Sequence, residues 1–327
     1  MSLINLTRFA ATLLPTFDQH GHEVALVLVA ARFDLPTQPS SPPEPSVDQP
    51  GPPLADVYPG EPGVGGPVRA AQSTFTRPGG DIYLCGSIRP PEPATQLALE
   101  LRVAEIAVQA WVFGERRWSQ GLTGWSITSP LPFESMPIDW SRCAGHLGDE
   151  RNPAGCHPPV QLHEGTLLPN FEDPRQIITT PKSPSTGFGL GPLPPHWQPR
   201  RGLAGTYDDA WQRDRAPYWP EDLDLHFFRC SPPHLQRAEP FTGGELVSMT
   251  GLLPRSVHFA LPALRIRFKA RLRGNRMIDR VRFDCLEIDL DAGVFTLFGR
   301  ASVVLHRGFG ALDEVVIREL RSWEHET

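Results

Sequence analysis

Carboxylates and tryptophans occur together in the loop-rich middle of the sequence, where they could form a hydrolytic site. The acidic residues of these loops are Asp139, Asp173, Asp208, Asp222 and Asp224. Two carboxylates beside Trp197 and Trp211 would provide the acid and the base that glycoside hydrolysis uses. Aspartates in Gly/Pro-rich loops more often bond to nearby backbone in turns. We therefore expect turn-forming roles, and we keep a carbohydrate-active or cell-wall hydrolase, or a sugar-binding module without catalysis, as alternative functions.

Metal-ligating residue types gather at two places. His20 and His22 flank a turn glycine, a position where histidines are usually solvated. The second set, in one loop, is Cys143, Cys156, His157 and His163. Its spacing matches no common zinc pattern. The five cysteines include no CxxC pair, so we expect reduced thiols. Neither set predicts a metal site.

Motifs that would bind a nucleotide or perform hydrolysis are missing from the chain. No GxxxxGK[ST] and no GxGxxG at a strand–helix junction occurs, and neither GxSxG nor HExxH is present. The sequence therefore predicts no cofactor, no metal and no catalytic residue.

Residues 169–228 set aromatic and arginine side chains into a backbone that is turned by glycine and stiffened by proline. A loop of this length is usually functional or disordered, and disordered segments are poor in aromatics. We predict an ordered recognition surface, because Trp, Tyr and Arg dominate interface hot spots. Its expected contact residues are Trp197, Arg200, Arg201, Tyr207, Asp208 and Trp211. The alternative is that these aromatics pack inward and hold the loops together.

A second candidate surface is the strand expected over residues 265–273, which reads RIRFKARLR. Alternation along a strand places its basic residues on one face, and Arg265, Arg267 and Lys269 are the proposed partner contacts. A turn at Gly274-Asn275 sets Phe268 opposite Val281 and Ile266 opposite Phe283.

The same register sets Arg267 opposite Arg282 and Lys269 opposite Arg280. Like charges that face each other destabilise a sheet, so an acidic group must cover this face. The expected source is the neighbouring segment, through Glu287, Asp289 or Asp291. The alternative is that an acidic segment of a partner protein docks on this basic face.

Charge and targeting signals favour a cytoplasmic protein. The net charge is −6 and the pI is about 6.0, which gives no basic footprint for nucleic acid over the whole protein. The N-terminus has no signal peptide pattern. The apolar run at residues 24–31 is far shorter than a membrane span. We expect neither nucleic acid nor a membrane as partner.

Composition predicts the fold class. The 37 prolines and 29 glycines among 327 residues make up roughly a fifth of the chain, against about an eighth on average. We predict a mainly β protein, with antiparallel sandwich or barrel-like sheets, long ordered Pro/Gly-rich loops and few short helices. Residues 97–118 favour two strands, and the spacing over residues 312–323 predicts a short terminal helix.

We expect a single adaptor domain over residues 1–327. Within it, residues 36–67 form a Pro-rich insertion or flexible loop, and residues 168–236 form an ordered loop lobe. Strands over residues 243–306 suggest a C-terminal β-meander.

Phrases spread over most of the chain carry a resemblance to a known family. They are VFGERRW (112–118), PFESMPIDWSRCAG (132–145), NPAGC (152–156), LPNFEDP (168–174), GFGLGPL (187–193), HWQPRRGLAGTYDDAW (196–211), PEDLDLHFFRCSPPHLQ (220–236) and GGELVSMTGL (243–252). In this order they resemble bacterial type VI secretion accessory proteins, a domain-of-unknown-function family of effector adaptors or chaperones.

The resemblance implies a binding role without chemistry. Such proteins are thought to bind a toxic effector, at its PAAR-containing or N-terminal region, and to promote its loading on the valine-glycine repeat spike. We therefore expect a non-catalytic adaptor that acts stoichiometrically and without ATP. An exposed strand edge could also accept a strand of the partner.

Overall fold

The computed structural model describes residues 2–38, 41–61, 65–156, 162–306, 308–320 and 324. The chain is 40% strand and 7% helix, so the prediction of a mainly β fold is confirmed. The sheets are mostly antiparallel, and within the described ranges none of them closes into a barrel. The described residues contain no helix that is long and apolar enough to cross a membrane.

A six-stranded sheet forms the centre of the molecule. Its strands, in spatial order, are β12 (Gln236–Arg237), β4 (Gly80–Cys85), β17 (Arg282–Asp289), β18 (Val294–Val304), β3 (Glu23–Asp34) and β2 (Ala10–Phe17). All neighbours are antiparallel except β4 and β17. β3 is buried along residues 24–31 on both faces, as its continuous run of Val, Leu and Ala predicts.

A five-stranded sheet packs against this centre. Its order is β11 (Phe171–Glu172), β7 (Ile106–Phe113), β6 (Gln96–Val103), β13 (Leu246–Thr250) and β14 (Val257–Ala260). The two strands predicted for residues 97–118 are confirmed as β6 and β7. Phe259 of this sheet stacks on Phe295 of β18, with ring centroids 4.9 Å apart, and Phe295 stacks on Phe33 of β3. These rings join the two sheets through one core.

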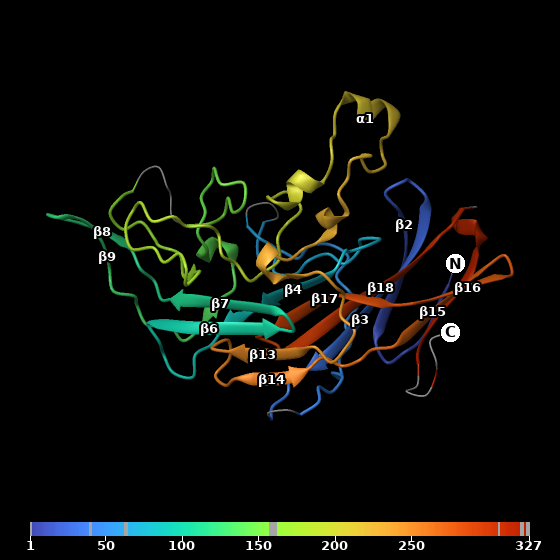
Figure 1. Ribbon diagram of the computed structural model, residues 1–327, viewed down its shortest axis with the longest axis horizontal. Coiled ribbons are helices and arrows are strands. Elements are labelled where there is room, and N and C mark those ends of the chain that lie inside the picture. The colour runs from blue at the N-terminus through green and yellow to red at the C-terminus, as the bar shows by residue number, and fades with distance from the viewer. Residues whose placement is uncertain are drawn as a thin grey trace.

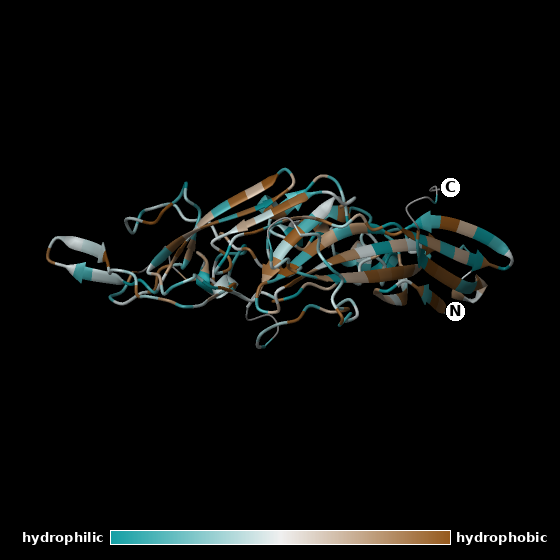
Figure 2. Cartoon of the chain, turned by 90° about the horizontal axis from the view of Figure 1, so that it is seen from below, coloured by the Kyte–Doolittle hydropathy of each residue, from teal (hydrophilic) through white to brown (hydrophobic). Residues whose placement is uncertain are grey.

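A four-stranded sheet lies at one end of the elongated molecule, and a small hairpin lies at the other (Figure 1, Figure 2). The sheet order is β1 (Leu3–Leu6), β19 (Leu312–Glu319), β15 (Ile266–Leu272) and β16 (Asn275–Arg280). The hairpin consists of β8 (Trp118–Gly121) and β9 (Gly124–Ile127). A further short pair is β5 (Ser87–Ile88) with β10 (Met136–Pro137).

The terminal helix predicted for residues 312–323 is wrong where the structure describes it, because Leu312–Glu319 is strand β19. The pairing with β15 shifts between Arg271 and Leu272, so that Leu272 faces Leu312 while Arg271 faces Glu314. This bulge adds one residue to β19 and places Leu312 and Val315, three residues apart, in the core. That spacing imitates a helical repeat. Residues 321–323 lie outside the described residues.

The hairpin predicted after β15 forms with a different register. Its turn is Arg273-Gly274, with φ of 45° and 88°, and not Gly274-Asn275. Two successive residues with positive φ match the turn type that suits a two-residue hairpin. Arg267 consequently faces Arg280, and Lys269 faces Ile278.

The strands of residues 243–306 form three hairpins in three different sheets, in place of one meander. β13 pairs with β14, β15 with β16, and β17 with β18. β16 and β17 are separated by Val281 alone, where the chain leaves the four-stranded sheet and enters the central one.

Helices are short and lie in the loops. They are η1 (Trp140–Arg142), η2 (Arg200–Leu203), α1 (Asp209–Asp214), η3 (Leu225–Phe228), η4 (Pro233–Leu235) and η5 (Phe309–Ala311). The Pro-rich segment over residues 36–67 runs along the central sheet in its described parts. Asp34 N–H donates to the Glu44 carbonyl, and Val57 N–H donates to the Arg69 carbonyl.

A buried ion network fastens these loops to the central sheet. Asp284 of β17 binds Arg300 of β18 at 2.9 Å and Arg77 at 3.4 Å. Asp81 of β4 lies 3.5 Å from Arg77 and 2.9 Å from Arg229. All five side chains are buried. Arg77 also donates to the Phe228 carbonyl. The network therefore ties the loops that contain Arg77 and residues 228–229 to strands of the central sheet.

Asp284→Asn should lower the free energy of unfolding by about 3–5 kcal/mol, because it leaves Arg77 and Arg300 buried without their shared charge. Urea unfolding followed by circular dichroism measures the change. The matched control is Asp291→Asn, since Asp291 binds the half-exposed Arg89 and should contribute less than about 1 kcal/mol. Equal effects of the two substitutions would contradict a structural role for the network.

Candidate functional site

The inner half of the loop lobe is buried. The Trp197 side chain is 1% exposed and meets Trp140 edge-on, with ring centroids 5.8 Å apart. Arg200 is buried as well, and it donates to the carbonyls of Phe227 and Leu193. The prediction that Trp197 and Arg200 lie on a recognition surface is therefore wrong. For both residues the alternative interpretation applies: their side chains point into the lobe and hold its loops together.

The outer half of the lobe forms a projection that carries α1, which stands clear of the sheets in Figure 1. We call residues 204–224 the aromatic arm. Asp208 accepts a hydrogen bond from Trp211 N–H at 2.8 Å and thereby caps the start of α1. The Tyr207 and Trp211 rings meet edge-on at 4.7 Å, and Tyr207 is 50% exposed. Trp211 Nε1 donates to the Tyr218 carbonyl, which closes the arm on itself.

One set of contacts closes the base of the arm, and another fixes the arm to the body. At its base, Asp222 accepts from Thr206 N–H and from Thr206 Oγ1, at 2.9 and 2.7 Å. Further out, Arg215 donates to the carbonyl of Gln19 in the β2–β3 turn at 2.6 Å. Gly205, next to Thr206 at the base of the arm, has φ of 83°, and a Cβ there would lie 2.8 Å from the Pro220 side chain. The arm is therefore a supported element with a tightly turned base.

Two aromatic residues were not predicted from the sequence as candidate contacts: Tyr218 of the arm and Phe17 beside it. Tyr218 meets Phe17 of β2 edge-on at 5.5 Å, and both rings are partly exposed. Phe17 comes just before the turn at residues 19–22, and a large aromatic next to a turn is a sequence signal that could have identified it as a surface contact. Arg201 lies at the foot of the arm and pairs with Glu150 at 2.7 Å, with both side chains more than half exposed. The exposed candidate residues are thus Arg201, Tyr207 and Asp208, joined by Phe17 and Tyr218, and Trp211 is partly exposed.

The loop carboxylates occupy turns, as the sequence predicts. Besides the cap made by Asp208 and the base made by Asp222, Asp139 accepts from Ser141 N–H, Asp173 from Arg175 N–H and Asp224 from His226 N–H. The backbone N–H of Thr206 lowers the pKa of Asp222, and that of His226 lowers the pKa of Asp224. A general acid of a glycosidase needs the opposite shift.

The two sets of potential metal ligands are not assembled into a site. His22 Nδ1 lies 3.0 Å from Asp18, and His20 bonds to Gln19. In the other set, burial raises the pKa of Cys143 well above its usual value and that of Cys156 to about 11, whereas thiolates are the metal-binding form. His157 lies outside the described residues. Across the described ranges, no three His, Cys, Asp or Glu residues are placed to hold a metal ion.

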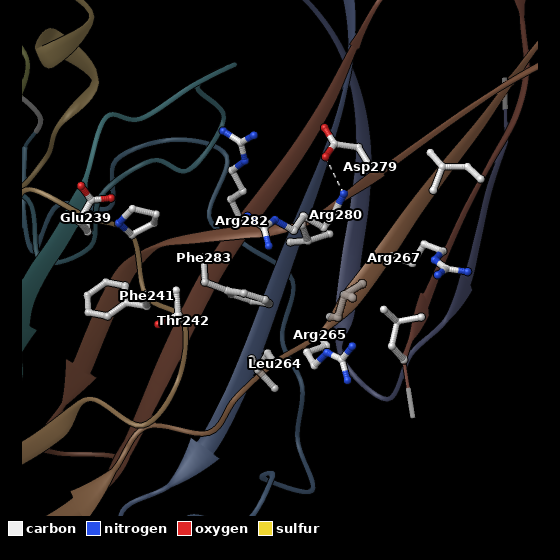
Figure 3. Close-up of a pocket in the computed structure, with 15 residues that line it drawn as sticks. Glu239, Phe241, Thr242, Leu264, Arg265, Arg267, Asp279, Arg280, Arg282 and Phe283 are labelled. Atoms are coloured by element: carbon white, nitrogen blue, oxygen red, sulfur yellow. Dashed lines mark hydrogen bonds between the residues drawn. The ribbon is translucent and has the colours of Figure 1, made fainter. Parts of the chain in front are cut away.

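The predicted basic face exists, and it borders a groove of about 690 Å³ (Figure 3). Arg265 and Arg267 line this groove, together with Arg280 and Arg282. Lys269 belongs to the same strand but is not among the lining residues. The groove lies between the β15–β16 hairpin and residues 239–242, and Figure 3 shows side chains of both walls.

The prediction that Glu287, Asp289 or Asp291 covers the basic face is wrong. Glu287 binds the Tyr83 hydroxyl at 2.6 Å, and Asp289 binds Arg69 at 2.6 Å. Both belong to β17 in the central sheet, because the chain changes sheets at Val281. Asp291 pairs with Arg89. The acids on the four-stranded sheet come from elsewhere: Glu324 binds Arg318, and Asp313 and Glu314 bind Arg271.

Trp197→Ala should reduce the free energy of unfolding by about 3–5 kcal/mol, because it empties a fully buried site. Trp211→Ala should reduce it by about 1 kcal/mol, from one hydrogen bond and one ring contact. Thermal and urea unfolding of the two variants checks the difference. A Trp211 variant that loses its fold would show that the arm is part of the core.

One of the comparisons with known proteins identifies a family. The family model described as "Uncharacterized protein conserved in bacteria (DUF2169)" matches residues 20–300. No curated protein and no solved structure matches the chain. Because the matched residues cover most of the sequence, the chain belongs to this bacterial family.

Proposed function

We propose that this protein is a non-catalytic adaptor, or chaperone, for a type VI secretion effector. It binds the PAAR-containing or N-terminal region of the effector and promotes loading on the valine-glycine repeat spike. Support comes from the resemblance of the sequence phrases to such adaptors and from the aromatic arm. The single observation that carries the proposal is the arm's ring pair of exposed Tyr207 and partly exposed Trp211 on a capped and anchored projection.

The shape of the arm favours a protein as ligand. Small-molecule sites are concave and bury most of the ligand's surface. The arm instead projects from the molecule (Figure 1), and Tyr207 at its outer part is half exposed. Tyrosine and tryptophan provide large contact areas with few rotatable bonds, which suits them to the centre of a protein interface.

Rigidity is the second feature that supports binding. The Asp208 cap, the Asp222–Thr206 base and the Arg215–Gln19 contact hold the arm in one conformation before a partner arrives. A surface that is already ordered loses little entropy on association, so more of the contact energy remains as affinity. Holding an effector until the spike assembles requires such affinity and no nucleotide.

The double variant Tyr207→Ala/Trp211→Ala should bind the effector at least about 30-fold more weakly, since two hot-spot side chains contribute on the order of 2 kcal/mol or more. The measurement is co-expression with the effector's PAAR-containing region, pull-down, and titration calorimetry of the purified pair. The control is Leu122→Ser at the tip of the β8–β9 hairpin, where Leu122 is fully exposed on the opposite end of the molecule.

Two results would overturn this proposal. One is unchanged effector binding and secretion by the folded double variant. The other is reproducible turnover of a glycan or peptidoglycan by the purified protein, which would favour the hydrolase alternative.

A further inference from the structure

Strand β16 is one open edge of the four-stranded sheet and pairs with β15 alone in the described part of the chain, while β1 forms the other edge. Its six residues are mostly exposed, and the Ile278 side chain is 53% exposed. Open edges of sheets attract further strands, and proteins usually cover or shorten them. Here the edge runs directly into the groove of about 690 Å³.

The hairpin register decides which backbone groups face outward. Val281 N–H donates to the Ile266 carbonyl at 2.9 Å, so residues 275, 277, 279 and 281 bond to β15. The intervening residues Arg276, Ile278 and Arg280 direct their backbone groups away from β15. The Arg280 N–H is already used by the Asp279 carboxylate at 2.8 Å. Ile278 therefore presents both its N–H and its carbonyl at the centre of the edge.

Positive charge surrounds this edge. Arg280 faces Arg267, which in turn faces Arg318 of β19, so three guanidinium-bearing positions form one row across the sheet. Arg265 and Arg282 line the same groove, which has two acidic residues, Glu239 and Asp279. β15 and β16 together carry five basic residues and one acidic residue.

The row binds a carboxylate of its own chain. Glu324 takes both Nη atoms of Arg318, at 2.6 and 3.0 Å, and its backbone carbonyl accepts from Arg265 at 2.6 Å. Such paired contacts between guanidinium and carboxylate are strong and directional. Within the chain itself, arginines at this end of the sheet thus bind a carboxylate and a backbone carbonyl.

The floor of the groove is apolar. Ile266, Val281 and Phe283 are buried beneath it, and Phe241 forms the wall and is held to Phe283 by a hydrogen bond of 2.7 Å. Nucleic acid requires a basic surface for its phosphates and flat rings for its bases. A strand edge next to an apolar floor with a basic rim instead matches a peptide strand that alternates apolar and acidic side chains.

We propose that this edge and groove form a binding site for an acidic, extended peptide segment, which adds to β16 as a further strand. Main-chain hydrogen bonds to Ile278 align the segment, and its carboxylates meet Arg282 on the rim of the groove. The site is separate from the aromatic arm, and its test does not involve the effector.

The probe is a synthetic peptide of about eight residues in which Val or Thr alternates with Asp or Glu, carrying a fluorophore for anisotropy. We expect saturable binding that weakens steeply with salt, because exposed charges are screened. A peptide with Lys in place of the acids should not bind. A peptide with N-methyl groups on alternate residues should bind at least about tenfold more weakly, because it loses the main-chain bonds.

Two variants test the two parts of the site. Ile278→Pro removes an outward N–H and none of the bonds to β15, so it should weaken binding about tenfold or more while the thermal melt is kept. Arg282→Glu should also weaken binding about tenfold, and it stands as the test if the proline variant unfolds. The matched control is Arg102→Glu on β6, which is exposed and pairs with Glu100 of the same strand.

Three outcomes would overturn the proposal. They are equal binding of the acidic and the lysine peptide, undiminished binding by both folded groove variants, and displacement of the peptide by a single-stranded oligonucleotide at lower concentration than by the unlabelled peptide. If this peptide test fails, the proposed role of the aromatic arm is unaffected. If the effector-binding test of the arm fails, the proposed peptide site is likewise unaffected.

Discussion

The buried charges around Asp284 and Asp81 are the constraint on which the candidate sites depend. A buried guanidinium without a carboxylate is strongly unfavourable, so Arg229 must lie at Asp81, Arg300 at Asp284, and Arg77 between the two acids. Asp81 also accepts from Cys230 N–H, and Arg77 binds the Phe228 carbonyl. The network therefore fixes the chain directly after η3. The Phe228 ring meets the Trp219 ring edge-on at 5.3 Å. The position of Phe228 therefore also constrains the aromatic arm, which contains Trp219.

A chain of aromatic contacts links the arm to the four-stranded sheet. Tyr218 of the arm meets Phe17, and Phe17 meets Phe309 at 6.3 Å, just before β19 begins. The Glu23 carboxylate accepts from Phe309 N–H and holds this junction at the start of β3. The aromatic arm is thus joined to the start of β19 through residues at the two ends of the β2–β3 turn. Substitutions at Trp211 and at Arg282 address one candidate surface each.

The sequence predicted those features that local patterning controls. Strict alternation identified β6 and β7, and the composition of the loops identified their aspartates as turn residues. Errors arose where long-range pairing decides the outcome. One bulge at Leu272 gave β19 a helix-like spacing, and a turn displaced by one residue shifted the β15–β16 register by two. No local signal distinguishes Trp197, which is sealed in the core, from Trp211 fourteen residues later, because both occur in the same type of loop.

The acidic net charge of the protein conceals a local excess of positive charge. The sequence interpretation placed Glu287 and Asp289 over the basic strand because they follow it closely along the chain. The change of sheet at Val281 carries them to the central sheet, where they bind Tyr83 and Arg69. Glu287 and Asp289 therefore do not cover the arginines of β15 and β16, and Glu324 instead binds Arg318 of the row and Arg265 beside it. Because fields from clustered charges act over about a Debye length, roughly 8–10 Å, it is this local arrangement and not the charge of −6 that determines which ligand approaches the edge.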